Sequence, residues 1–222
     1  MPITGAVPFW SPAEIEAAIP NTIAHLVGHG VLAYPTETVY GLGGAIDAES
    51  VDELLSIKRR PPGKPFLVLV SASAMIERLG LRLTHSASRL AARFWPGPLT
   101  LVLPGGERRV PEQLCGPEGG VAVRWTPHPA LQQLIKTYGD AITSTSANQP
   151  GAAPAASAAS IVESWSREVS TGRLRVLDAG TLTLSQPSTV VDCTGRAPRV
   201  IRPGAISAEV LRRAAPDLIG DR

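Results

Sequence analysis

Short apolar runs alternate with segments of helical periodicity along most of the chain, and this alternation restricts the fold more than any other feature. Because strand-like and helix-like segments follow one another with short connections, we expect one α/β domain built on a twisted, mixed β-sheet. The predicted strands are residues 31–34, 66–70, 99–103, 121–124, 141–144, 174–177, 189–192 and 199–202. The predicted helices are residues 22–29, 49–59, 74–79, 86–94, 129–138, 160–169 and 207–214, after a first helix that begins at Pro12.

The ends of the chain are predicted to be helical additions to a single domain that covers residues 1–222. A helical segment is expected within residues 1–30 and a short helix within residues 206–222. Residues 104–120 are rich in glycine and proline and predict a loop. The Ala/Ser/Pro-rich stretch at 152–160 is typical of a linker or of the entry into a helix.

The first helix carries clear start signals. Ser11 is a good N-cap, Pro12 suits the first helical position, and Glu14 completes a capping box. Pro20 is expected to end this helix, since a proline in a helix interior removes a hydrogen bond and clashes with the preceding turn. A second helix would then follow over residues 22–29.

Residues 31–44 read VLAYPTETVYGLGG and form the stretch around which the other elements are expected to gather. Pro35 lacks a backbone N–H and stops the pairing of the apolar strand before it. Thr36, Glu37 and Thr38 then lie at the carboxyl end of that strand, where open α/β sheets bind ligands. We interpret the glycines that follow as a loop in which backbone closely approaches a ligand.

Composition excludes several classes of protein. With 44% hydrophobic and 18% charged residues the chain is globular, and a net charge of +2 indicates no general polyanion-binding surface. Two cysteines, Cys115 and Cys193, make neither a disulfide scaffold nor a zinc site, and His25 and His29 fit a solvated helix face better than a metal site. Because no targeting pattern or membrane-length apolar run occurs, we expect a cytoplasmic protein. From the spacing of the cysteines and histidines we expect no tightly bound metal.

A basic segment is the first candidate ligand site. The sequence holds no GxxxxGK[ST] loop, no GxGxxG after a strand and no GxSxG elbow. Residues 58–65, KRRPPGKP, instead place Lys58, Arg59, Arg60 and Lys64 between a helix and a strand. Arginine forks and lysine charges bind phosphate or carboxylate. Alternatively, the bases complement the helix dipole, and the residues alone leave both interpretations open.

Hydroxyl and basic groups at other strand ends are weaker candidates. Residues 144–151, STSANQPG, offer hydroxyls and a carboxamide to a polar ligand, although Asn-x-Pro-Gly is equally typical of a turn. Arg124 and Arg202 each end an apolar run, and Ser188 precedes another. Residues 95–100, WPGPLT, form a rigid aromatic turn before a strand, which is also typical of a packed corner.

Taken together, these segments resemble the YrdC-like family from about residue 31 to residue 205. The family's diagnostic KxR…SxN combination is present as Lys58, Arg60, Ser146 and Asn148. Its motifs occur in order as PTETVYGLG at 35–43, KxRP at 58–61, WPGPLT at 95–100, VAVR at 121–124, STSAN at 144–148, STVVD at 188–192 and IRPG at 201–204.

The resemblance implies a twisted mixed sheet with flanking helices around a large basic cavity. It also implies a nucleotidyltransferase that condenses L-threonine, bicarbonate and ATP into threonylcarbamoyl-AMP and releases pyrophosphate. Mg²⁺ is expected to accompany ATP. The product would supply a threonylcarbamoyl transferase complex that makes N6-threonylcarbamoyladenosine (t6A) at position 37 of tRNA.

Roles for single residues are implied by matching motifs. Lys58, Arg60, Ser146 and Asn148 would form the catalytic set, with Lys58 facing the phosphates or the carboxylated intermediate. Threonine would contact Thr36, Arg124, Ser144 and Ser188. The nucleotide would contact Arg60, Lys64, Thr100, Ser146, Pro154 and Arg202.

The chain departs from its relatives at three points. Leu69 stands where many relatives have a polar residue, often His, and Lys64 replaces an Asn common in some of them. Only a short tail follows Ala205, so we expect the short, single-domain form. Other functions stay open: an RNA-binding module with weak tRNA binding, a family paralogue or carbamoyl-transfer domain that acts on another acceptor, or a synthase for another amino acid. A domain of a larger carbamoyltransferase is not expected, because the sequence has no acylphosphatase-like or zinc-finger segment.

Overall fold

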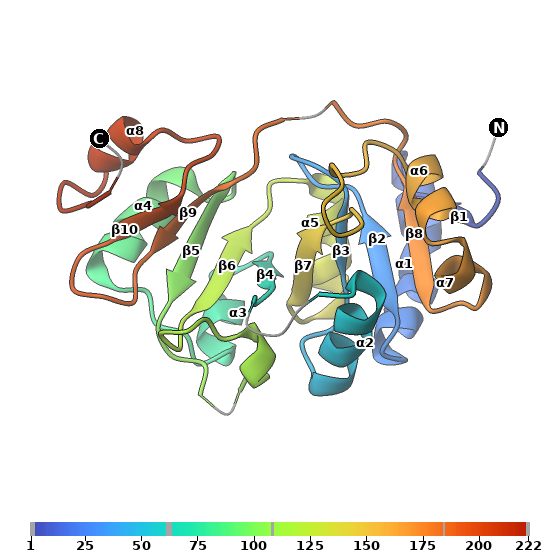
Figure 1. Cartoon of the computed structure of the whole chain (residues 1–222), viewed down its shortest axis with the longest axis horizontal. Helices are drawn as coiled ribbons and strands as arrows, with labels where there is room; N and C mark the ends of the chain where they lie inside the picture. Colours follow the sequence, from blue (N-terminus) through green and yellow to red (C-terminus); the bar gives the residue numbers. More distant parts are fainter. Residues whose placement is uncertain (1–2, 61–63, 108, 184, 221–222) are drawn as a thin grey trace.

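The computed structural model describes residues 3–60, 64–107, 109–183 and 185–220, which form one β-sheet with helices packed against it (Figure 1). The sheet has ten strands in the order β1-β8-β2-β3-β7-β4-β6-β5-β9-β10. The strands are β1 (Ala6–Pro8), β2 (Val31–Tyr34), β3 (Gly41–Gly43), β4 (Leu67–Val70), β5 (Leu99–Leu103), β6 (Val121–Trp125), β7 (Ile142–Ser146), β8 (Leu174–Asp178), β9 (Thr189–Asp192) and β10 (Arg199–Arg202). The helices are α1 (Pro12–Val27), α2 (Ala48–Lys58), α3 (Ser73–Arg78), α4 (His85–Phe94), α5 (Pro129–Tyr138), α6 (Ala158–Ser164), α7 (Ser166–Ser170) and α8 (Ala208–Arg212), with a 3-10 turn, η1 (Glu112–Leu114).

Strand pairing is mixed, which confirms the predicted α/β class. β4 runs parallel to β6 and β5 parallel to β9, whereas β3 and β7 are antiparallel to each other and β7 is antiparallel to β4. Although β8 and β9 are consecutive in the chain, they lie in opposite halves of the sheet. The segment that joins them crosses above the middle strands (Figure 1).

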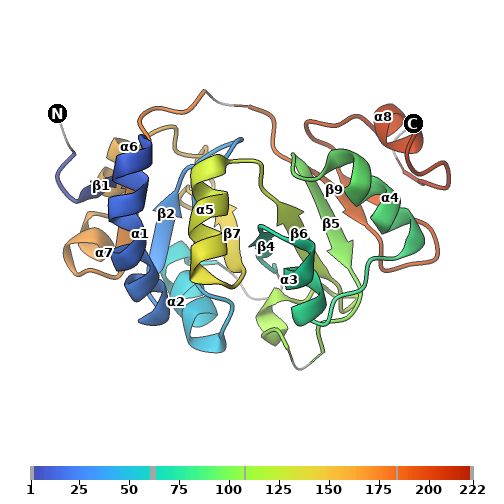
Figure 2. The ribbon, with the colours of Figure 1, turned by 180° about the vertical axis from the view of Figure 1, so that it is seen from behind.

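One face of the sheet is covered by α1, α3, α4 and α5, whereas α2 lies on the other face (Figures 1 and 2). Figure 2 shows α1 and α5 side by side over one half, with α3 and α4 continuing the layer over the other. β2 is buried along its whole length, because it contacts both α1 and α2. This double burial explains why its sequence is continuously apolar rather than alternating.

The break predicted at Pro20 is wrong, because α1 runs through it as one helix. Pro20 is exposed, so water can satisfy the carbonyl that loses its partner. Ile19 and Thr22, on either side, are buried in the core. Packing of the apolar face thus outweighs a local penalty of about 3 kcal/mol. The capping box of Ser11 and Glu14 is present as predicted.

The loop predicted for the first glycine-rich stretch is wrong as well, since Gly41–Gly43 form β3 between β2 and β7. A Cβ at Gly43 would overlap the Thr143 carbonyl of β7. The strand therefore requires glycine for close backbone approach, a reason that a strand propensity does not capture. β1 was also not predicted, and it makes the N-terminal segment more than a helical addition.

The remaining boundaries agree with the predictions to within a few residues. The helix predicted over 160–169 is divided into α6 and α7 at Trp165, and the loop predicted over 104–120 contains η1. Within 206–222, α8 spans Ala208–Arg212, while residues 221 and 222 lie outside the described part. In the described part of the chain, no helix is long and apolar enough to cross a membrane.

Candidate active site

A cavity of about 380 Å³ opens over the centre of the sheet. Along β6 and β7 the lining includes the alternate residues Ala122 and Arg124, and Ser144 and Ser146, which share one face because side chains alternate across a strand. Most of the residues predicted from the sequence line this cavity: Thr36, Arg60, Thr100, Arg124, Ser144, Ser146, Pro154, Ser188 and Arg202. Lys58, Lys64 and Asn148 are not part of its lining.

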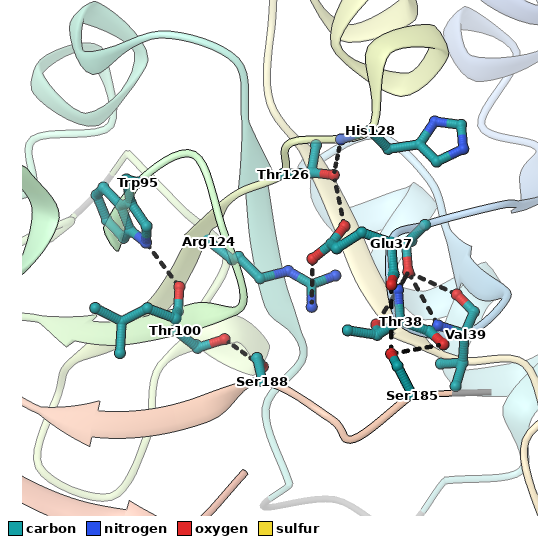
Figure 3. Close-up of polar contacts among 12 residues, drawn as sticks. Glu37, Thr38, Val39, Trp95, Thr100, Arg124, Thr126, His128, Ser185 and Ser188 are labelled. Carbon is teal, nitrogen blue, oxygen red and sulfur yellow. Dashed lines mark hydrogen bonds and ion pairs between the residues drawn. The ribbon is translucent and has the colours of Figure 1, made fainter. Parts of the chain in front are cut away.

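A buried ion pair occupies one wall of the site (Figure 3). Arg124 Nη1 lies 3.3 Å from Glu37 Oε1, and only 5% of the arginine side chain and 17% of the glutamate side chain are exposed. Glu37 Oε2 accepts a hydrogen bond of 2.9 Å from Thr126 Oγ1, which in turn accepts one of 3.2 Å from the His128 backbone N–H. Glu37 thereby connects the loop after β2 to the end of β6.

The loop after β2 is fixed by the Thr36 hydroxyl. This group donates to the Val39 carbonyl at 2.6 Å and accepts from the backbone N–H groups of Thr38 and Val39, each at 3.2 Å. Ser185, from the chain between β8 and β9, donates weakly to the Glu37 and Thr38 carbonyls at 3.3 and 3.4 Å (Figure 3). The loop is therefore held in shape without a ligand.

The opposite wall joins three predicted residues. Thr100 Oγ1 lies 2.8 Å from Ser188 Oγ (Figure 3), and Arg202 Nη2 donates to the Ser188 carbonyl at 2.8 Å and to its hydroxyl at 3.1 Å. Burial lowers the pKa of the Arg202 guanidinium, and the nearby charge of Arg124 lowers it further. Two cations thus face the same space, and an anion bound between them would relieve their repulsion.

Arg60 forms a third basic group, and its own segment orients it. Its Nε donates to the Lys64 carbonyl at 2.8 Å and its Nη1 to Thr145 Oγ1 at 3.1 Å. The guanidinium carbon lies 4.9 Å from the centre of the Phe66 ring, a cation–π distance. Burial lowers its pKa. Lys64 contributes its backbone to this arrangement, and its side chain is exposed.

Lys58 and Asn148 contact each other beside the cavity. Lys58 Nζ donates to the Ser146 carbonyl at 2.9 Å, to the Asn148 carbonyl at 2.5 Å and to Asn148 Oδ1 at 3.2 Å. Burial, and after it the charge of Arg60, lowers the pKa of Lys58 to about 8. The KxR and SxN segments, far apart in sequence, are therefore joined directly.

Several residues of the site had no predicted role. Glu37 lies in the stretch that the sequence singled out, and Thr145 directly precedes Ser146, the first residue of SxN. Glu37 is a carboxylate at one predicted strand end, and arginines occur at other strand ends of the same predicted site. This combination could have identified Glu37 as an ion-pair partner for one of the arginines. Thr126 carries no such signal, because only the fold brings its hydroxyl to Glu37.

A tightly held metal has no obvious ligand set here. Among the described residues, no group of three or more His, Cys, Asp or Glu side chains could hold an ion. The nearby carboxylate, Glu37, is paired with Arg124. Leu69 is fully buried in β4 and offers no polar atom to a ligand.

Sequence comparisons identify proteins that are related to this chain. The model of the Sua5/YciO/YrdC family, described as "Telomere recombination", matches residues 24–204. The threonylcarbamoyl-AMP synthase of Thiobacillus denitrificans is 37% identical over 183 residues, which cover 82% of this chain and 94% of that protein. The enzyme of the same name from Pyrococcus abyssi is 34% identical over 85% of this chain, and the match spans only 54% of its length.

Solved structures with a similar fold include proteins of the same kind. P. abyssi Sua5 complexed with L-threonine superposes with a TM-score of 0.84 at 30% identity, over 96% of this chain and 62% of that one. Escherichia coli YciO superposes with a TM-score of 0.79 over 93% of this chain and 97% of that one, and at 23% identity this likeness supports the fold alone. The chain belongs to the Sua5/YciO/YrdC family.

Proposed function

We propose that this protein is a threonylcarbamoyl-AMP synthase, which makes threonylcarbamoyl-AMP and pyrophosphate from L-threonine, bicarbonate and ATP. The observation that carries the proposal is the convergence of Arg60, Arg124 and Arg202 on one cavity. A reaction that brings an amino acid carboxylate, a carbamate and a triphosphate together needs such a concentration of positive charge. Relatives at 34% and 37% identity bear this enzyme's name.

The chemistry follows from these groups. The free amine of threonine, after loss of its ammonium proton, attacks the carbon of bicarbonate, and loss of water leaves a carbamate. One carbamate oxygen then attacks the α-phosphorus of ATP, the bond to the β-phosphate oxygen breaks, and pyrophosphate leaves. No covalent enzyme intermediate is needed, so the site requires positioning and charge stabilisation rather than an activated nucleophile.

The residues that line the cavity are divided between the two larger substrates in this proposal. Arg124 binds the threonine carboxylate, with Ser144 and Ser188 beside it, and Thr36 shapes the loop that closes this side. Arg60 and Arg202 offset the charge of the triphosphate. Thr100, Ser146 and Pro154 complete the nucleotide side, and Lys64 reaches the phosphates only if its exposed side chain turns inward.

Mg²⁺ fits this site as a companion of ATP. Mg²⁺ commonly keeps several waters and takes its remaining ligands from substrate phosphates. When bound in this way, it neutralises part of the charge on the phosphates. The product would then serve a transferase that makes t6A in tRNA, and the small net charge of +2 gives little support to a separate RNA-binding role.

An omission experiment tests this proposal. Pyrophosphate release should require ATP, L-threonine and bicarbonate together, because the carbamate is the attacking group. Serine should be a poorer substrate, by the factor of about 10–200 that one methyl group in a pocket can supply. Pyrophosphate release that ignores bicarbonate contradicts the proposed chemistry, whereas a strong preference for another amino acid would assign the site to a different substrate.

A further inference from the structure

The hydrogen bonds of Lys58 leave its ammonium group no free donor. An ammonium has three N–H bonds, and here they meet the Ser146 carbonyl, the Asn148 carbonyl and Asn148 Oδ1. The residue is only 6% exposed and does not line the cavity. A contact with a phosphate would therefore require Lys58 to give up one of these buried partners.

The same network fixes the orientation of the Asn148 amide. Asn148 Nδ2 lies 2.9 Å from each of two carbonyl oxygens, those of Gln149 and Ala152, which can only accept hydrogen bonds. The other amide atom faces the Lys58 ammonium, which can only donate. The nitrogen must therefore face the carbonyls and the oxygen must face Lys58, since the reversed amide would place like groups together at three contacts.

This orientation decides where the Ser146 proton lies. Ser146 Oγ is 2.5 Å from Asn148 Oδ1, and an amide oxygen can only accept. The serine hydroxyl is therefore the donor in this bond. Because Ser146 also lines the cavity, it presents lone pairs to a ligand and has no proton left to offer.

We propose that Ser146 accepts a hydrogen bond from an N–H or O–H group of the substrates, and that Lys58 and Asn148 are positioning residues that hold Ser146 in this state. Phosphate oxygens only accept at neutral pH, so the partner of Ser146 is not the triphosphate. Two sources of such a donor exist in the proposed reaction: the amine of the amino acid, and the ribose or adenine of the nucleotide. The inference rests on the proposed function only for the identity of these substrates.

Binding measurements with Ser146→Ala test the chemical class of the partner. Titration calorimetry with L-threonine, ATP and tripolyphosphate separates the amino acid, the nucleoside and the phosphates as sources. We expect tripolyphosphate affinity to change less than about twofold, and affinity for threonine or ATP to fall by about five- to tenfold, as for one lost hydrogen bond. Ser88→Ala, an exposed serine on α4, is the matched control. A loss confined to phosphate-containing ligands, tripolyphosphate included, or no loss for any ligand, overturns the assignment.

A second measurement reads the positioning role in the protein without substrates. The chain has three lysines, Lys58, Lys64 and Lys136, so selective ¹⁵N-lysine labelling gives a simple spectrum that single substitutions assign. At pH 6 the Lys58 ammonium should show slow proton exchange, as for a buried group, and this protection should decrease in Asn148→Ala. Its signal should stay in place when tripolyphosphate is added. Fast exchange, or a shift on binding tripolyphosphate larger than that of Lys136, overturns the positioning role.

The two proposals fail in different ways. If the parent protein binds neither ATP nor threonine, the proposed function is wrong, while the lysine spectrum still decides whether Lys58 and Asn148 hold Ser146. If the parent binds both but Ser146→Ala loses affinity for tripolyphosphate, the assignment of Ser146 is wrong, while the proposed function is left to the omission experiment. Lys58→Arg should retain part of the pyrophosphate-releasing activity that Lys58→Met loses, because arginine still donates hydrogen bonds to the same carbonyls.

Discussion

Removing the charge of Glu37 should destabilise the protein and at the same time create a better anion site. In Glu37→Gln the side chain keeps nearly its shape and an oxygen for Thr126, so the main change is the loss of the partner charge of Arg124. That arginine is 5% exposed, and its Nε has no hydrogen-bond partner among the described residues. The substitution therefore leaves a poorly solvated cation.

The size of the effect follows from the geometry. Two unit charges 3.3 Å apart attract by about 5 kcal/mol at an effective dielectric constant of about 20, and desolvation of both groups offsets part of this. Removing one partner of a buried pair costs about 3–5 kcal/mol. Because 17% of the Glu37 side chain is exposed, water reaches the pair, and we expect a loss of about 3 kcal/mol in unfolding free energy.

Urea unfolding followed by circular dichroism measures this loss, with Glu163→Gln, an exposed carboxylate on α6, as control. Phosphate should stabilise Glu37→Gln more than the parent, since an anion beside Arg124 replaces the missing carboxylate. A variant as stable as the parent, or one that phosphate stabilises no more than the parent, would show that Glu37 does not neutralise Arg124.

Three further results are expected. Arg60→Ala should lower the rate of pyrophosphate release by about 10- to 100-fold. Because Arg60 contacts its own segment and Phe66, the variant should also lose about 1–2 kcal/mol of unfolding free energy. Arg89→Ala is the control, and an effect on stability alone would contradict a role of Arg60 in the reaction. Burial lowers the pKa of Lys58 from 10.5 to about 8 in the folded state, so the unfolded state binds more protons between these pH values. The unfolding free energy of the parent should therefore rise with pH, by on the order of 2–3 kcal/mol in urea titrations, whereas that of Lys58→Met should not. An equal rise in both proteins would contradict this. Burial, and after it the charges of Asp192 and Asp217, raises the pKa of Cys193 to about 12. A thiol reagent at pH 8 should therefore modify Cys193 only after unfolding. Rapid labelling of Cys193 itself in the native protein would contradict its burial.

The sequence predicted the elements whose signals are local. The strands at Thr189–Asp192 and Arg199–Arg202 have the predicted bounds, and the Ser11 capping box forms as expected. Each of these depends on residues a few positions apart. The mixed sheet also followed from the alternation of apolar runs with helical segments.

The errors arise where distant residues decide the structure. Pro20 stays inside α1 because the core holds both sides of it, and Gly43 belongs to a strand because β7 passes too close for a Cβ. Strand order was not predictable from the residues, since the pairing of β5 with β9 depends on contacts between segments far apart in the chain. Tertiary context overrides local propensity at these positions.

The site shows the same division. Motif order identified many of the residues that line the cavity, because a shared sequence pattern carries their positions, but it also included Lys58, Lys64 and Asn148, which do not line it. It did not show that Lys58 donates to the SxN segment, or that Arg124 is paired with Glu37. Directions of side chains depend on which neighbours supply acceptors, and only the folded chain brings those neighbours together.

One measurement tests the central claim most directly: mass spectrometry of the nucleotide product formed from ATP, L-threonine and ¹³C-bicarbonate, with pyrophosphate measured in the same sample. The proposed chemistry predicts threonylcarbamoyl-AMP that carries one ¹³C in its carbamoyl group, with one pyrophosphate released for each product molecule. An adenylate without the label, or hydrolysis of ATP to ADP and phosphate with no threonine adduct, would contradict it.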